Sequence, residues 1–229
     1  MLIGGIQKLT LIDYPKKLAA LVFTQGCPFL CHFCHNKSLV LKEDFLPPIN
    51  EEKFFDFLKS RINKLDAVVI SGGEPSIQKD LYAFTKKIKD LNFLVKLDTN
   101  GINPDIIQKL LNDNLLDYIA MDIKAPLTKY EALINKKIDL KKIVLSIEII
   151  KNSKIDNEFR STLIKNFHSI ADILEMASLI KEAKKYFLQK FINTNTLNKE
   201  YQKFSSFSDD ELLNIKNNHL KNFRNVFIR

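Results

Sequence analysis

The sequence predicts an α/β protein in which parallel strands alternate with helices. Short apolar runs rich in Val, Ile, Leu and Phe recur along the chain, separated by segments whose apolar residues recur at helical spacing. Glycines and charged residues gather directly after these runs, as they do at the carboxyl ends of parallel strands, where ligands bind. The alternation therefore indicates consecutive βα units.

Strands and helices are expected in turn along almost the whole chain. The short apolar runs predict buried strands at residues 18–24, 67–71, 93–97, 117–121, 159–164 and 186–191. The segments between and after them predict helices at residues 51–64, 77–91, 104–114, 143–150, 170–184 and 209–222.

Local signals support several of these helices. Asn50 and Ser208 are suitable N-caps, and Pro104 stands in the first turn, where a missing N–H costs nothing. Residues 143–150 are ambiguous because their β-branched content favours a strand. We predict a helix there because apolar residues recur at helical spacing, namely Leu140, Ile143, Val144, Ile147 and Ile150.

The composition is that of one globular domain, with 229 residues, 45% of them hydrophobic and 27% charged. We expect residues 1–192 to form the main body and residues 193–229 to add a C-terminal loop and helix to the same domain. A chain of this length buries enough surface to fold without a disulfide or a metal ion. Any metal site is therefore expected to serve function.

The net charge of +8 comes almost entirely from lysines that are dispersed along the chain. A nucleic-acid-binding protein usually concentrates its arginines or a basic stripe in one place, so we expect no nucleic-acid partner. No apolar run approaches the roughly 20 residues of a membrane-spanning helix, and residues 1–10 lack a signal-peptide pattern. The sequence predicts a cytoplasmic protein with no membrane contact.

All three cysteines, Cys27, Cys31 and Cys34, lie in one short loop. An odd number of cysteines in a cytoplasmic protein argues against a disulfide framework and favours metal coordination. One possibility is zinc with His35 as the fourth ligand. The other is an iron–sulfur cubane in which one iron has no protein ligand and is open to a small molecule. His32 and His35 are as compatible with positions beside the metal, or facing solvent, as with a role as ligands.

Polar residues follow each of the first four predicted strands, and one more lies within the fifth. Each group alone has a simple explanation as a turn or a surface ion pair. Together they suggest a ligand shaped like an amino acid: paired glycines allow close approach, Glu74 suits an ammonium group, and Lys124 or Arg160 suits a carboxylate. After the cysteine loop, the groups are Gly72, Gly73, Glu74 and Pro75; Asp98, Thr99, Asn100 and Gly101; Asp122 and Lys124; and Arg160.

The cysteine spacing, with Phe33 before the last cysteine, resembles the hallmark motif of the radical S-adenosylmethionine (SAM) superfamily, and residues 72–75 resemble its methionine-amino motif. A narrower resemblance, from Gly5 to about Phe191, is to the activases of glycyl radical enzymes, in particular those of anaerobic ribonucleoside-triphosphate reductase. The segments that carry it are residues 13–15, 23–27, 34–36, 98–101, 121–126, 158–162, 168 and 188–191.

This resemblance implies a partial (β/α)6 barrel that holds a [4Fe–4S] cluster on Cys27, Cys31 and Cys34. It further implies a monovalent cation and the SAM carboxylate near Asp98, Thr99 and Asp122. The full set of implied SAM-binding residues is Phe33, Gly72, Gly73, Glu74, Pro75, Asp98, Thr99, Asn100, Asp122, Lys124, Arg160 and His168. Residues 15–16 and 165–167 depart from the family pattern, which leaves the role of His168 open.

By the same resemblance, the reduced cluster cleaves SAM to a 5′-deoxyadenosyl radical, which then removes a hydrogen atom from a glycine of the reductase. The cofactors supply this chemistry, so no acid–base residue is required. A flavodoxin or ferredoxin would supply the electron. Two alternatives remain: a radical SAM enzyme that acts on another glycyl radical enzyme or a small molecule, and a non-catalytic Cys3His zinc module.

Overall fold

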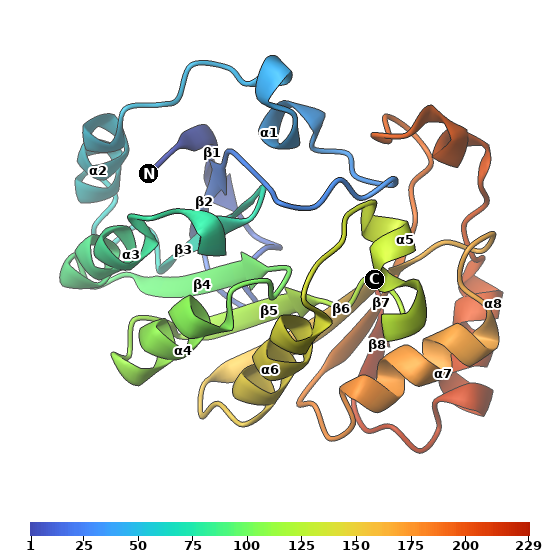
Figure 1. Ribbon diagram of the computed structural model, residues 1–229. Coiled ribbons are helices and arrows are strands. Elements are labelled where there is room, and N and C mark those ends of the chain that lie inside the picture. Colours follow the sequence, from blue (N-terminus) through green and yellow to red (C-terminus); the bar gives the residue numbers. More distant parts are fainter. The chain divides into compact units, whose positions relative to one another are not determined.

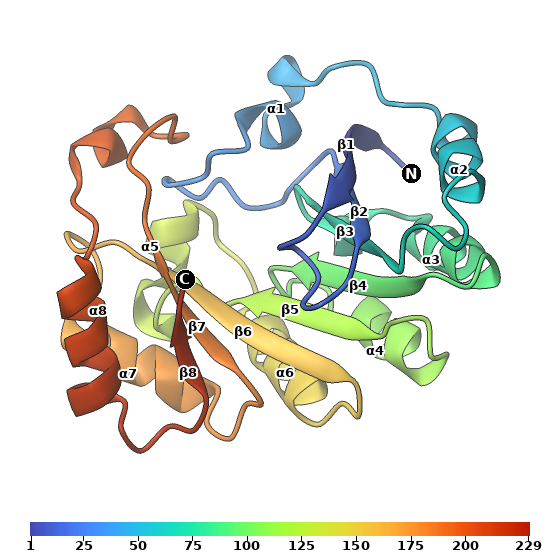
Figure 2. The ribbon, with the colours of Figure 1, turned by 180° about the vertical axis from the view of Figure 1, so that it is seen from behind.

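The computed structural model describes residues 1–229, which form two compact units. The first unit contains residues 1–28 and 36–119, and the second contains residues 29–35 and 120–229. The chain passes from one unit to the other within strand β5 (Tyr118–Asp122) (Figures 1 and 2). The cysteine loop is divided as well, because Cys27 belongs to the first unit whereas Cys31 and Cys34 belong to the second.

The first unit is organised by parallel strands. Strand β1 (Ile3–Thr10) runs antiparallel to β2 (Ala19–Thr24), and β2, β3 (Ala67–Gly72) and β4 (Leu94–Thr99) follow in parallel. The middle strand β3 is apolar throughout Ala67–Ile70 and fully buried there, as expected for a strand covered on both faces.

Helices connect these strands by parallel crossovers. They are α1 (Lys37–Val40), α2 (Glu51–Lys59), α3 (Leu81–Asp90) and α4 (Pro104–Asn112), with 3-10 turns η1 (Lys42–Asp44) and η2 (Pro75–Ile77). Asn50 caps α2 by accepting a hydrogen bond from Glu52 N. Phe54 of α2 stacks on Phe84 of α3, with ring centroids 5.4 Å apart, so these two helices share an apolar interface.

The second unit contains strands β6 (Asp156–Leu163), β7 (Tyr186–Lys190) and β8 (Val226–Ile228), which are all parallel (Figure 2). Its helices are α5 (Tyr130–Ile134), α6 (Leu140–Lys151), α7 (Ile170–Leu179) and α8 (Asp209–Asn214). Short turns add η3 (Leu127–Lys129), η4 (Lys199–Lys203) and a π turn η5 (Ile215–His219). No helix in the structure is both long and apolar enough to cross a membrane.

The predicted α/β class is confirmed, and so are the six expected strands, which correspond to β2 through β7. The ambiguous segment is helical, as α6, because its stripe of Ile143, Ile147 and Ile150 packs into the core. Three helices end five or more residues earlier than predicted: α2 stops at Lys59, α7 stops at Leu179, and α8 gives way to the π turn after Asn214. The sequence did not predict β1, β8, α1 or α5.

Candidate functional site

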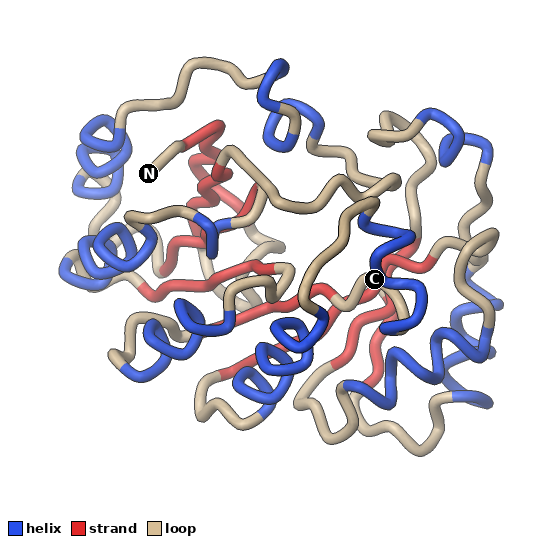
Figure 3. The backbone as a smooth tube through the Cα atoms, viewed as in Figure 1, coloured by secondary structure: helices blue, strands red, loops and turns tan.

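The loops that follow β2 and β3 pack against each other through their backbones (Figure 3). Gly73 N donates to Thr24 O over 2.8 Å, and Glu74 N donates to Gly26 O over 2.8 Å. A Cβ on Gly73 would lie 2.2 Å from Gly26 O, and one on Gly72, whose φ is +108°, would lie 2.4 Å from Thr24 N. The glycine pair is thus required to bring the Gly72–Pro75 turn against the start of the cysteine loop.

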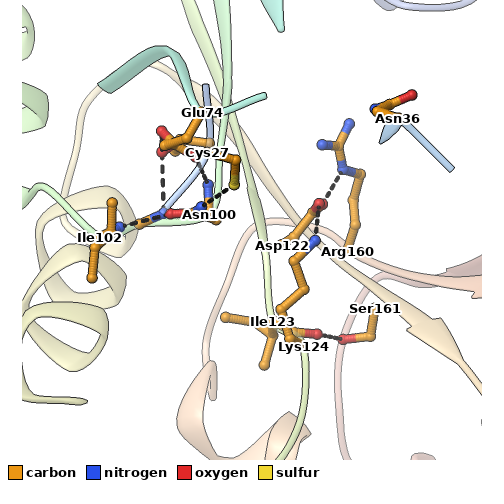
Figure 4. Close-up of polar contacts among 12 residues, drawn as sticks. Cys27, Asn36, Glu74, Asn100, Ile102, Asp122, Ile123, Lys124, Arg160 and Ser161 are labelled. Atoms are coloured by element: carbon orange, nitrogen blue, oxygen red, sulfur yellow. Dashed lines mark hydrogen bonds and ion pairs between the residues drawn. The ribbon is translucent and has the colours of Figure 1, made fainter. Parts of the chain in front are cut away.

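Glu74 is buried, with 1% of its surface exposed, and its carboxylate is directed toward the end of β4 (Figure 4). Its Oε1 accepts from Thr99 Oγ1 at 2.7 Å and from Ser76 N at 3.0 Å, and its Oε2 accepts from Asn100 N at 2.7 Å. Burial raises the pKa of Glu74, and these donors oppose that shift. Glu74 therefore fixes the turn after β4 and keeps about one lone-pair site for any further partner.

Asn100 links this turn to the cysteine loop. Its Nδ2 lies 3.7 Å from Cys27 Sγ, within the range of a hydrogen bond to sulfur, and its Oδ1 accepts from Ile102 N at 3.0 Å (Figure 4). Hydrogen bonds to cysteine sulfur help to set the potential of an iron–sulfur cluster. Asn100 is therefore placed to act on the Cys27 thiolate.

Asp98 is paired with a residue that the sequence analysis missed, Lys96. The two side chains lie on the same face of β4, with Lys96 Nζ 2.6 Å from Asp98 Oδ1, and Lys96 is only 2% exposed. The ammonium group also lies 5.7 Å from the ring centroid of Tyr118. The signal was present in the sequence, because Val95 and Leu97 alternate with Lys96 and Asp98 at the period of a strand.

In the second unit, Cys31 and Cys34 are the ends of a tight turn in which Cys34 N donates to Cys31 O over 2.9 Å. None of the three cysteines forms a disulfide. Cys31 is buried, which raises the pKa of its thiol to about 12, and the nearby charge of Lys124 opposes the shift. A metal bound there must therefore displace the thiol proton.

Asp122, at the end of β5, lies between two cations (Figure 4). Its Oδ1 accepts from Arg160 Nε at 2.8 Å, and its Oδ2 accepts from Lys124 Nζ at 2.7 Å. Arg160 and Lys124 hold the pKa of Asp122 well below its usual range, and Asp122 raises the pKa of Lys124. Lys124 Nζ also lies 5.6 Å from the ring centroid of Phe33, which is buried.

A second carboxylate lies near Arg160. Arg160 Nη1 is 4.0 Å from Glu158 Oε1, which in turn lies 3.5 Å from Arg229 Nη1. Glu158 is 1% exposed, so this carboxylate is buried beside the two arginines.

His168 is 1% exposed, and both of its ring nitrogens are hydrogen-bonded. Its Nδ1 accepts from Ile164 N at 3.0 Å, so Nε2 carries the proton and donates to Lys124 O at 3.0 Å. His168 therefore positions the backbone of Lys124, and no ring nitrogen remains for a ligand. Burial lowers the pKa of His168 to about 4, which makes the imidazole neutral at pH 7.

This burial of His168 predicts a pH-dependent stability. In the unfolded chain the imidazole gains a proton below about pH 6.5, whereas in the folded protein it does so only near pH 4, so the folded state loses stability as the pH falls through this range. The loss is about 3 kcal/mol between pH 7 and pH 4. Denaturant unfolding of His168→Gln should show a correspondingly flatter pH dependence, with exposed His219→Gln as the control. Parallel curves for His168→Gln and the unmodified protein would contradict the assignment.

The other residues singled out in the sequence make contacts within their own units. Pro75 begins the turn η2 and is buried, and Thr99 is buried with its hydroxyl between Glu74 and Gly101 N. His35 Nε2 lies 2.7 Å from Ile192 O. His32 lies against Tyr201, and its Nδ1 is 3.3 Å from Asn198 Nδ2.

The sequence matches the family model of the radical SAM superfamily over residues 21–189. A protein of Methanocaldococcus jannaschii named "Putative glycyl-radical enzyme activating enzyme" is 34% identical over 235 residues, which cover 100% of this chain and 95% of that protein. A GTP 3′,8-cyclase of Campylobacter jejuni is 27% identical over 200 residues, covering 84% of this chain and 60% of the cyclase.

Solved structures share the fold. Streptococcus suis SuiB bound to S-adenosylmethionine matches with a TM-score of 0.68 and 15% identity. The match covers 90% of this chain and 48% of SuiB, so this chain spans about half the length of that enzyme. The likeness shows a common architecture.

Proposed function

Because this chain belongs to the radical SAM superfamily, we propose that it is the activase of a glycyl radical enzyme, specifically of anaerobic ribonucleoside-triphosphate reductase. The observation that carries the proposal is the 34% identity, over the full chain, to a protein named as such an activating enzyme. Motifs 98–101 and 121–126, which resemble those of the reductase activases, support the narrower target.

Membership of the superfamily makes this protein a radical SAM enzyme and implies a [4Fe–4S] cluster and SAM as cofactors. The non-catalytic zinc module is thereby excluded. The donor set fits the cluster: Cys31 and Cys34 end one turn, Cys27 has an amide donor at its sulfur, and none of the three is in a disulfide. We assign Cys27, Cys31 and Cys34 as the three cluster ligands.

We propose two sets of SAM contacts. In the first unit, the turn at Gly72–Pro75 would bind the amino group, and Asp98, Thr99 and Asn100 would flank it. In the second unit, Lys124 or Arg160, the two cations beside Asp122, would bind the carboxylate. A monovalent cation, which the resemblance also implies, would have to compete with Lys96 at Asp98 and with Arg160 and Lys124 at Asp122.

A [4Fe–4S] cluster held by Cys27, Cys31 and Cys34, together with SAM, would supply the one-electron radical chemistry. The protein's own residues bind and orient these groups. Lys124 or Arg160 would hold the carboxylate of SAM, Glu74 fixes the turn after β4, and Asn100 donates toward the Cys27 sulfur. We place the protein in the cytoplasm, because thiols outside disulfides fit a reducing compartment. Its electron donor would be of the flavodoxin or ferredoxin type, because a net charge of +8 favours an acidic partner.

Arg160→Gln tests the proposed carboxylate contact. Loss of one charge-assisted hydrogen bond is expected to weaken SAM binding about 10- to 100-fold, measured by calorimetry on the cluster-loaded protein. Arg224→Gln, at an exposed arginine, is the control and should leave the affinity unchanged. Unchanged SAM affinity in Arg160→Gln, with an intact cluster, would remove Arg160 from the site.

The target is tested by electron paramagnetic resonance. The anaerobic protein, reduced with dithionite and supplied with SAM, is expected to produce a glycyl-radical signal on purified anaerobic ribonucleoside-triphosphate reductase. A signal only on another glycyl radical enzyme would overturn the reductase assignment and keep the activase role.

The likeness to a GTP cyclase favours one further candidate, a small-molecule substrate. Consumption of GTP with no protein radical would establish that alternative.

A further inference from the structure

Residues 192–201, which we call the strap, bind the turn that carries Cys31 and Cys34. Leu197 N donates to Cys34 O over 2.8 Å, and Asn198 N donates to His32 O over 2.9 Å. At the start of the strap, Ile192 O lies 2.7 Å from His35 Nε2. The strap therefore bonds to three of the four residues from His32 to His35.

Side chains reinforce these backbone bonds. The His32 ring stacks on Tyr201 with centroids 5.1 Å apart and an interplanar angle of 28°. Asn198 Nδ2 lies 3.3 Å from His32 Nδ1, and Tyr201 is 8% exposed. Tyr201 also packs on Phe204, with ring centroids 4.5 Å apart. The partly exposed His32 side chain thus packs against the strap.

The strap is itself anchored at both ends. It follows β7 directly, and beyond it Ser206 forms an isolated antiparallel bridge with Ile164. Asn198 caps the η4 turn by accepting from Glu200 N at 3.0 Å, and Thr196 is fully buried, with its hydroxyl donating to Asn198 O. The strap is thus an ordered part of the unit.

The cysteine turn is held from a second direction by α5. Leu30 N donates to Ile134 O over 2.9 Å, and His32 N donates to Leu133 O over 3.2 Å. Both backbone polar groups of His32 are therefore bonded, one to the helix and the other to the strap. None of these bonds involves a cysteine sulfur, so they leave all three sulfurs available to a cluster.

We propose that the strap preorganises the Cys31–Cys34 turn and thereby sets how rapidly the iron–sulfur cluster is lost, with Tyr201 and Asn198 as the positioning residues. Ligands that are ordered in advance lose less conformational entropy on binding, and a turn that opens less often exposes its thiolates less often. This inference rests on the cluster assignment above and is independent of which partner the enzyme activates.

The test compares Tyr201→Ala with Tyr201→Phe, which retains the ring. In the iron-free protein, backbone amide exchange of residues 31–35 is expected to be about tenfold faster in Tyr201→Ala and unchanged in Tyr201→Phe. In the reconstituted protein kept without oxygen, the visible absorbance of the cluster is expected to decay about tenfold faster under an iron chelator in Tyr201→Ala.

Asn198→Ala provides a second variant for the case in which Tyr201→Ala does not fold, and the same two changes are expected in it. Lys203→Ala is the control, because Lys203 lies just beyond the strap, is exposed and contacts only Glu200 among the ion pairs. Unchanged amide exchange in the strap variants, or faster exchange with an unchanged rate of cluster loss, overturns the proposal. Neither readout involves a partner enzyme or SAM, so failure here is distinct from failure of the proposed function.

Discussion

Replacement of Cys31 by alanine is expected to abolish cluster binding and SAM cleavage together. Cys31 is the most buried of the three cysteines and ends the turn that also carries Cys34. If the three cysteines are the cluster ligands, only two thiolates would remain and a second iron would lack a protein ligand. Iron and sulfide analysis after anaerobic reconstitution should show far less than four irons per chain, and 5′-deoxyadenosine should be undetectable.

His35→Ala is the matched control, because His35 is exposed and lies in the same loop. In a zinc site of the Cys3His type, loss of His35 would remove a ligand, whereas in the three-cysteine cluster it leaves the iron content at four. A Cys31→Ala variant that retains a full four-iron cluster would contradict the three-ligand assignment. The thermal midpoint of the iron-free variant shows whether the fold is intact.

Replacement of Glu74 by alanine is expected to lower the free energy of unfolding by about 3–6 kcal/mol, because it leaves Ser76 N, Thr99 Oγ1 and Asn100 N buried without an acceptor. The same substitution removes the hydrogen bonds that Thr99 and Asn100, at the end of β4, donate to Glu74. The affinity for SAM should therefore fall even under conditions in which the variant remains folded. Denaturant unfolding and calorimetry measure the two effects.

Glu74→Gln keeps the shape of the side chain and removes its charge. The amide retains one acceptor oxygen, but it places an NH2 group opposite one of the donors. The free energy of unfolding of Glu74→Gln is expected to lie between those of Glu74→Ala and the unmodified protein. The control is Glu175→Ala, which removes an exposed carboxylate from α7 and should change stability by less than about 0.5 kcal/mol. Equal stability of Glu74→Ala and the control would show that the buried carboxylate does not hold this turn.

Much of the fold could be predicted because local pattern and tertiary structure agree. The six strands from β2 to β7 are short apolar runs, and α6 shows a helical stripe strong enough to override its β-branched content. The missed strands depend on distant pairing. In β1, Gly4 and Gly5 weaken the local strand signal, and the strand forms by antiparallel pairing with β2. In β8, three residues give too little pattern to detect.

The side-chain contacts of the candidate site could not be predicted from the sequence. Spacing and motifs place polar residues at strand ends, but they do not show which way a side chain points. Glu74, expected to face an ammonium group, is turned inward to hold Thr99 and Asn100. Both nitrogens of His168 are bonded to backbone groups.

No sequence pattern indicated that the strap contacts the cysteine loop. Residues 192–201 are polar and irregular, and their hydrogen bonds to His32 and Cys34 join parts of the chain that are far apart in sequence. Lys96 is a different case, because its period-two pattern with Asp98 was readable. Contacts between distant parts of the chain, such as those of the strap, can be identified only in the folded structure.

The most direct test of this account is anaerobic reconstitution, followed by iron and sulfide analysis and an assay for 5′-deoxyadenosine after addition of dithionite and SAM. The account predicts four irons and four sulfides per chain, with product formation that requires both the reductant and the cluster. Bound zinc with no SAM cleavage, or cleavage that persists after the cluster is removed, would contradict it.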